Sequence, residues 1–93
     1  MSAEKRVRAY LELATKDVEA AELLLAGANR YSAYHVQQSI EKVTKALLLA
    51  RGIEAGIEHR RIPSDPPAED LRRDMSALRA LIVTVRIELL GTA

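Results

Sequence analysis

Apolar residues recur along this chain at intervals of three and four, which is the spacing of one face of an α-helix. Such stripes run through residues 3–26, through residues 34–54 and from residue 66 onward. The first stripe is Val7, Tyr10, Leu11, Ala14, Val18, Ala21 and Leu25; the second is Val36, Ile40, Val43, Leu47 and Ala50; the third is Leu71, Met75, Leu78, Ile82, Val85 and Leu89. The pattern therefore predicts three helices.

Turn-forming residues separate the first two helices and end the second. Gly27 closes the first helix, and a turn as short as residues 28–30 places the second helix antiparallel to it. Gly52 suits the left-handed conformation that ends a helix, and the apolar Ile53 after it suits a Schellman cap. The last two turns before Gly52 are apolar nearly all round, so the second helix is predicted to be central.

The third helix is predicted to begin with Asp65 as its N-cap and Pro66 at its first helical position. A short helical turn is expected before it, near residues 57–61. The end of the third stripe also alternates with period two over residues 83–89, as a half-buried strand does. No second strand is visible in the sequence to pair with it, and a lone strand is unstable, so a helix is predicted here too.

The 93 residues are expected to form one domain, residues 1–93, near the low end of what folds alone. The fold class is predicted to be all-α: an antiparallel bundle of three main helices with a short helical turn after Gly52. A net charge of +1 creates no global field that would attract nucleic acid or a membrane. The charged start, the lack of cysteine and the lack of a long apolar run point to a cytoplasmic protein without a membrane span.

The third helix carries more apolar residues than one intramolecular seam can bury. Residues outside its stripe include Leu81, Val83, Ile87 and Leu90. Left in water they would form an apolar patch of the kind that marks interaction sites. We therefore expect a homodimer with Val83, Ile87 and Leu90 at the interface.

Polar residues on the second helix are the first candidate site. Gln38, Glu41 and Lys45 lie on one face, and Glu41 and Lys45 have the spacing and order of a favourable ion pair. This row is either an ion pair at the edge of the helix packing or a polar surface lining a groove or dimer interface.

The second candidate site is basic: Arg60 and Arg61 follow His59, and Arg51 is nearby. Guanidinium groups match phosphate oxygens, so this loop is a candidate phosphate site, although short basic loops are more often simply solvated. Two histidines and no cysteine give no metal site, and no cofactor is indicated.

The second helix also resembles that of a known family. The run from Tyr34 to Lys42, together with Lys45-Ala46-Leu47-Leu48 and Arg51-Gly52, resembles the second helix of HEPN domains. The resemblance extends to His59, where members often have a histidine. It implies a role beside a minimal nucleotidyltransferase or in a toxin–antitoxin pair, with RNA or nucleotide as the ligand class.

Arg30 and His35 meet the Arg-x4–6-His spacing of HEPN ribonucleases. The family's catalytic pair lies late in the fold, however, and no histidine follows His59 here. Alternatively, His35 packs against Tyr31 or Tyr34 at the start of its helix. The expected function is a non-catalytic interaction module, and the alternative is a metal-independent ribonuclease that uses Arg30 and His35 across a dimer.

Overall fold

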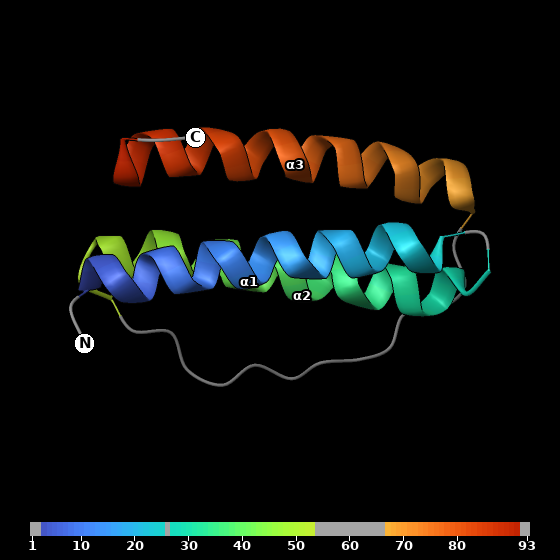
Figure 1. The fold of residues 1–93 in the computed structure, drawn as a ribbon, viewed down its shortest axis with the longest axis horizontal. Coiled ribbons are helices and arrows are strands. Elements are labelled where there is room, and N and C mark those ends of the chain that lie inside the picture. The colour runs from blue at the N-terminus through green and yellow to red at the C-terminus, as the bar shows by residue number, and fades with distance from the viewer. Residues whose placement is uncertain (1–2, 26, 54–66, 92–93) are drawn as a thin grey trace.

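The computed structural model describes residues 3–25, 27–53 and 67–91. It contains three helices, α1 (Ala3–Leu24), α2 (Asn29–Ala50) and α3 (Ala68–Leu90) (Figure 1). No strand occurs within the described ranges, and α3 includes residues 83–89. The all-α prediction is therefore confirmed, and the choice of helix over strand for the end of the chain was correct. The short turn expected at residues 57–61 lies outside the described residues.

The end of α2 has the predicted cap. Gly52 adopts φ 79°, and its N–H donates to the carbonyl of Leu49 at 2.9 Å. The N–H of Ile53 donates to the carbonyl of Leu48, also at 2.9 Å. These two bonds are the pair that defines a Schellman motif. They satisfy carbonyl groups that the last turn of a helix would otherwise leave without partners.

The starts of α2 and α3 differ from the predicted ones. α2 begins at Asn29, five residues before the start of the predicted stretch, so Asn29 and Arg30, which were expected in the turn, belong to the helix. α3 begins at Ala68, after Pro67 in an extended conformation with φ −61° and ψ 143°. A residue that precedes a proline is disfavoured in the helical region, so Pro66 is a poor first helical position. The predicted N-cap Asp65 and Pro66 lie outside the described residues.

The three helices do not alternate in direction. Figure 1 shows α1 and α2 running in opposite directions, whereas α3 runs in the same direction as α2. The first turns of α2 and α3 accordingly line one groove, with Ala33 and Val36 opposite Asp70 and Leu71. The α2–α3 pair therefore differs from the expected antiparallel arrangement. The 13 residues 54–66 can span about 43 Å when extended, more than the roughly 33 Å length of α2. A connection of that length does not force antiparallel neighbours.

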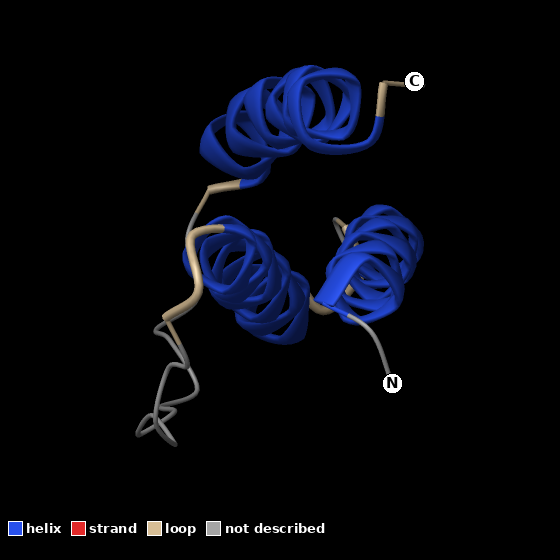
Figure 2. Ribbon diagram, turned by 90° about the vertical axis from the view of Figure 1, so that its left-hand side faces the viewer, coloured by secondary structure: helices blue, strands red, loops and turns tan. Residues whose placement is uncertain are grey.

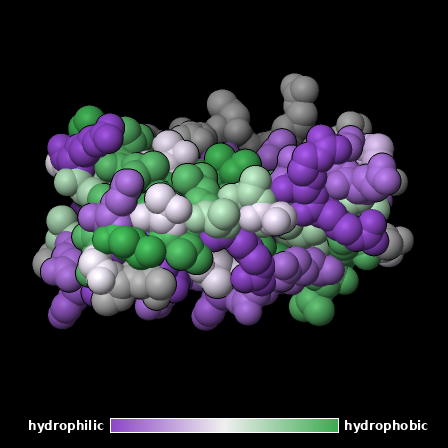
Figure 3. All heavy atoms as spheres, turned by 90° about the horizontal axis from the view of Figure 1, so that it is seen from above, coloured by the Kyte–Doolittle hydropathy of each residue, from purple (hydrophilic) through white to green (hydrophobic). Residues whose placement is uncertain are grey.

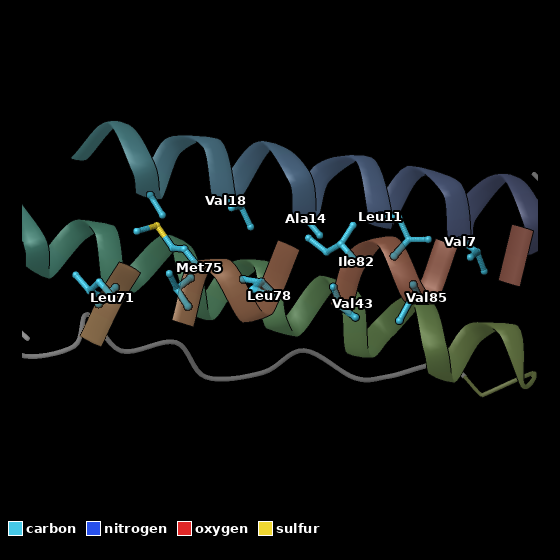
Figure 4. Close-up of a cluster of buried hydrophobic side chains, with 14 of the residues drawn as sticks. Val7, Leu11, Ala14, Val18, Val43, Leu71, Met75, Leu78, Ile82 and Val85 are labelled. Atoms are coloured by element: carbon cyan, nitrogen blue, oxygen red, sulfur yellow. The ribbon is translucent and has the colours of Figure 1, made fainter. Parts of the chain in front are cut away.

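The core lies between the three helices, which occupy the corners of a triangle when seen end-on (Figure 2). Five residues from each of the stripes of α1 and α3 are buried: Val7, Leu11, Ala14, Val18 and Ala21 on α1, and Leu71, Met75, Leu78, Ile82 and Val85 on α3. Figure 4 labels all of these except Ala21. The stripes predicted for α1 and α3 are thus confirmed.

The buried face of α2 is rotated from the predicted stripe. Val36 and Val43 are buried as expected, but Ile40 is 47% exposed and Ala50 is exposed. The positions that replace them in the core are Ala33, Ala46 and Leu49. The rotation arises because α2 packs most extensively on α1, and it turns its small residues toward that helix.

Two buried serines explain how closely α1 and α2 pack. The Ser32 hydroxyl donates to the carbonyl of Ala21 at 2.7 Å, and the Ser39 hydroxyl donates to the carbonyl of Ala14 at 2.8 Å. Both serines are fully buried. Ser32 and Ser39 are two turns apart on α2, and Ala14 and Ala21 are two turns apart on α1. The two hydrogen bonds therefore repeat along the interface. Side chains this small let the backbones approach, and the hydrogen bonds satisfy the buried hydroxyl groups.

Candidate functional site

A buried carboxylate lies between α1 and α2. Asp17 is 9% exposed, although it belongs to a helix whose other buried residues are all apolar. Its Oδ1 lies 3.1 Å from Nδ1 of His35, and its Oδ2 accepts a hydrogen bond from Nζ of Lys42. We call these three residues the Asp17 cluster. A buried carboxylate requires such partners, because an unpaired buried charge is strongly destabilising.

The Asp17 cluster was not predicted from the sequence. A signal for it was present, because Asp17 lies three residues after Ala14 and four before Ala21, between positions of the buried stripe. Small neighbours on both sides leave room for partners from another helix. His35 and Lys42 are seven residues apart on α2 and therefore point to the same side.

The cluster gives His35 a defined environment. An ionised carboxylate accepts hydrogen bonds only, so Nδ1 of His35 carries the proton in the contact with Asp17. The second ring nitrogen, Nε2, is then either an acceptor in the neutral ring or a donor in the protonated one. The His35 ring also packs edge-on against Tyr34, with 5.5 Å between ring centroids. This is one of the two tyrosine contacts expected from the sequence.

Arg30 and His35 do not come together on α2. They are five residues apart on one helix, which places them about 140° apart around its axis. Arg30 is exposed in the first turn, whereas His35 is partly buried against α1. The spacing of the ribonuclease motif is therefore present, but within one chain the two side chains point in different directions.

The polar row on α2 extends from the interior to the surface. Gln38 is only 5% exposed, and its Nε2 has no hydrogen-bond partner within the described residues. Glu41 and Lys45 are half-buried on the same face. The proposed pairing of Glu41 with Lys45 stays a prediction. An unsatisfied amide in such a position costs about 1–3 kcal/mol, so Gln38 is the least favourable of the three predicted binding residues for monomer stability.

The basic residues are only partly described. Arg51 is exposed at the C-terminal end of α2, where its N–H donates to the carbonyl of Leu48. His59, Arg60 and Arg61 lie outside the described residues. Of the predicted phosphate site the structure therefore places only Arg51, six residues beyond Lys45.

Two of the three predicted dimer residues are on the outer surface of α3. Val83 is 46% exposed and Ile87 is 52% exposed, whereas Leu90 is half-buried and packs against the core. Leu81 is also exposed. In Figure 3, apolar residues are most extensive over the half of this face where α3 ends, and charged residues dominate the half where it begins.

The amino-acid sequence of this chain matches the model of a known family. The family model of the HEPN domain matches residues 7–88 of this 93-residue chain, from the first buried turn of α1 to the last turn of α3. The chain belongs to the HEPN domain family. Searches of the curated proteins and of the solved structures returned no match. The resemblance noted in the second helix is therefore confirmed over most of the chain.

HEPN domains are associated with nucleotide- and RNA-related functions and with toxin–antitoxin systems. In the described part of this HEPN domain, no group of three histidine, aspartate or glutamate side chains is arranged to hold a metal ion. None of the described helices combines the length and apolar character required to cross a membrane.

Proposed function

We propose that this HEPN domain is a non-catalytic interaction module that associates with RNA or nucleotide, as one half of a nucleotidyltransferase or toxin–antitoxin pair. The observation that carries the proposal is the Asp17 cluster. Asp17 holds both His35 and Lys42, so the only described histidine takes part in packing α2 against α1. Arg30 points away from it around α2, so within one chain Arg30 and His35 do not form a pair.

A cleavage assay tests the non-catalytic part of the proposal. The purified protein is incubated with a structured RNA and with a single-stranded RNA, in the presence of a metal chelator. We expect no cleavage above that of a His35→Ala variant. Metal-independent cleavage that His35→Ala abolishes, with the helical circular dichroism signal retained, would contradict the proposal.

One observation favours the alternative, a metal-independent ribonuclease. The contact between Asp17 and Nδ1 of His35 fixes the tautomer and leaves Nε2 as a potential proton acceptor, which a general base requires. In that case Arg30 would be supplied by a second chain. The ribonuclease predicts that Asp17→Asn lowers the cleavage rate and shifts its pH profile, and that mixing Arg30→Ala with His35→Ala chains restores part of the activity.

The proposed RNA or nucleotide surface comprises Gln38, Glu41, Lys45 and Arg51, and the proposal also includes His59, Arg60 and Arg61, which lie outside the described residues. Lys45 and Arg51 supply positive charge along α2, and Arg51 is exposed at its end. Phosphate contacts of this kind depend strongly on salt, because binding releases counterions. Fluorescence anisotropy with a short single-stranded RNA tests this surface. We expect Arg51→Gln to weaken binding and reduce its salt dependence, whereas the matched change Arg72→Gln on α3 should do neither.

A homodimer is part of the proposed function. Val83 and Ile87 expose apolar side chains on the outer face of α3, and Leu90 extends this surface toward the core. Light scattering at micromolar concentration measures the mass directly. We expect twice the mass of one chain for the wild type, and a less stable but helical monomer for the Val83→Glu/Ile87→Lys variant. A wild-type mass of one chain would refute the dimer.

A further inference from the structure

A groove of about 230 Å³ lies between α1 and α3, and it shares no lining residue with the groove between α2 and α3 that Asp70 and Asp74 line. Its floor is apolar, and its edges carry two arginines and a threonine. The lining residues are Thr15, Val18, Arg79, Ile82, Val83 and Arg86. None of them belongs to the proposed RNA surface.

The two arginines of this groove differ in their hydrogen-bond partners. Arg79 forms a two-pronged ion pair: its Nε and Nη2 donate to the two carboxylate oxygens of Glu22, at 2.8 and 2.5 Å. This fork-to-fork pair lowers the pKa of Glu22, because the hydrogen bond from Arg79 favours the ionised carboxylate. Glu22 therefore neutralises Arg79 and holds it at the edge of the groove.

Arg86 makes no ion pair within the described residues. Its Nη2 donates to Oγ1 of Thr15 at 3.4 Å, a long contact with a neutral group. The Thr15 hydroxyl donates to the carbonyl of Leu11, so it only accepts from Arg86. A guanidinium has five N–H donors, and four of those on Arg86 have no partner within the described residues. Arg86 is also half-buried, which strengthens any anion contact it makes.

The local charge decides which anion suits the groove. Glu22 offsets the charge of Arg79, so Arg86 is the one lining cation without an ion pair within the described residues, and Glu19, which also acts on Arg79, makes the α1 edge more negative. That balance suits a monoanion and disfavours a phosphate dianion. The apolar floor of Val18, Ile82 and Val83 suits a hydrocarbon group attached to it.

We propose that the α1–α3 groove binds a small organic acid whose carboxylate is held by Arg86 and whose hydrocarbon tail lies on Val18, Ile82 and Val83. A guanidinium matches a carboxylate in a bidentate contact. The volume is below the several hundred Å³ typical of pockets for drug-sized ligands, so the acid has few carbon atoms.

An NMR titration of the whole chain with hexanoate, propionate and 1-hexanol tests the proposal. Propionate matches a glutamate side chain of a docking protein, whereas 1-hexanol lacks the charge. We expect hexanoate to shift the amides around the groove, and to bind about tenfold more tightly than propionate because its extra methylene groups are partly buried. Equal affinity for propionate, or for 1-hexanol, would refute the proposal.

Variants of Arg86 test whether this residue binds the carboxylate. Arg86→Gln should weaken hexanoate binding at least tenfold, and Arg86→Lys should keep part of it, because a charge remains without the fork geometry. Arg72→Gln, an exposed arginine of α3 outside the groove, should have no effect. Undiminished binding by a folded Arg86→Gln variant, or shifts spread over the whole chain, would overturn the assignment.

Val83 belongs both to this groove and to the proposed dimer face, so the two proposals must be separated. The Ile87→Lys variant changes the dimer face and keeps every residue of the groove. We expect it to bind hexanoate as tightly as the wild type does, whatever its oligomeric state. Loss of binding in this variant would show that the groove of one chain is not the site.

Discussion

Removing the charge of Asp17 is the sharpest test of how α1 and α2 are held together. Asp17→Asn keeps the shape of the side chain and an oxygen that can accept from His35, so the change isolates the negative charge. Lys42 then retains its positive charge beside a neutral amide. The side chains of Lys42 and His35 are only 22% and 31% exposed, and that of Asp17 is 12% exposed, so solvent compensates only in part.

The expected loss of stability follows from this burial. Breaking a fully buried ion pair by removing one partner costs about 3–5 kcal/mol, whereas an exposed pair is worth at most about 1 kcal/mol. The Asp17 cluster lies between these limits, so we expect Asp17→Asn to cost about 2 kcal/mol. For a domain of this size that corresponds to a fall in Tm of roughly 8–16 °C.

Urea unfolding followed by circular dichroism measures this cost, at one fixed protein concentration because a dimer would make stability depend on concentration. Asp74→Asn, the same change at an exposed position of α3, is the matched control and should alter stability by less than about 0.5 kcal/mol. Adding Lys42→Met to Asp17→Asn should recover part of the loss, because the uncompensated ammonium is removed. Equal effects of Asp17→Asn and Asp74→Asn would refute the reasoning.

Three further predictions test the helix ends, the ion pair and the core. Gly52→Ala should cost about 1 kcal/mol, since φ is 79° there, whereas Gly27→Ala, where φ is not positive, should cost almost nothing; equal Tm values would contradict this. Glu22 is exposed, and its pKa is lowered from the ordinary value of 4.5. Its contribution to the free energy of unfolding is therefore present above that pH and is lost as the pH falls through the folded pKa. Glu22→Gln should therefore cost about 0.5 kcal/mol at pH 7 and nothing at pH 2 in urea unfolding, and an equal cost at both would count against the pair. Leu11→Ala, at a fully buried position, should cost about 2–5 kcal/mol by the same assay, and a loss below 1 kcal/mol would place Leu11 outside the core.

Local periodicity was sufficient to predict the three helices. The outer stripes of α1 and α3 were identified residue by residue, because each helix buries one face and an apolar stripe defines that face. The Schellman cap at Gly52 was also predictable, since it depends on a left-handed residue followed by an apolar one. Likewise the family could be inferred, because its signature lies within one continuous helix.

The antiparallel arrangement of α1 and α2 was predicted from the short turn between them, but the direction of α3 and the rotation of α2 were not predictable from the same patterns. The direction of α3 depends on how a 13-residue connection returns, and the exposure of Ile40 depends on how α2 is rotated against α1. Small residues such as Ser32 and Ser39 decided that rotation, although they carry no hydrophobic signal.

The candidate site likewise combines a residue identified from the sequence with a contact that depends on tertiary packing. The sequence identified His35 through its spacing from Arg30, but its partner is Asp17, eighteen residues earlier on another helix. A stripe analysis treats an isolated aspartate as solvent-facing. Only the packing of α2 on α1 places a histidine and a lysine against Asp17. Their contacts offset the free-energy cost of burying its charge. Hydrophobic periodicity thus determined the buried faces of α1 and α3, whereas the rotation of α2 and the meeting of charged groups from different helices depended on tertiary packing, because no local spacing encodes them.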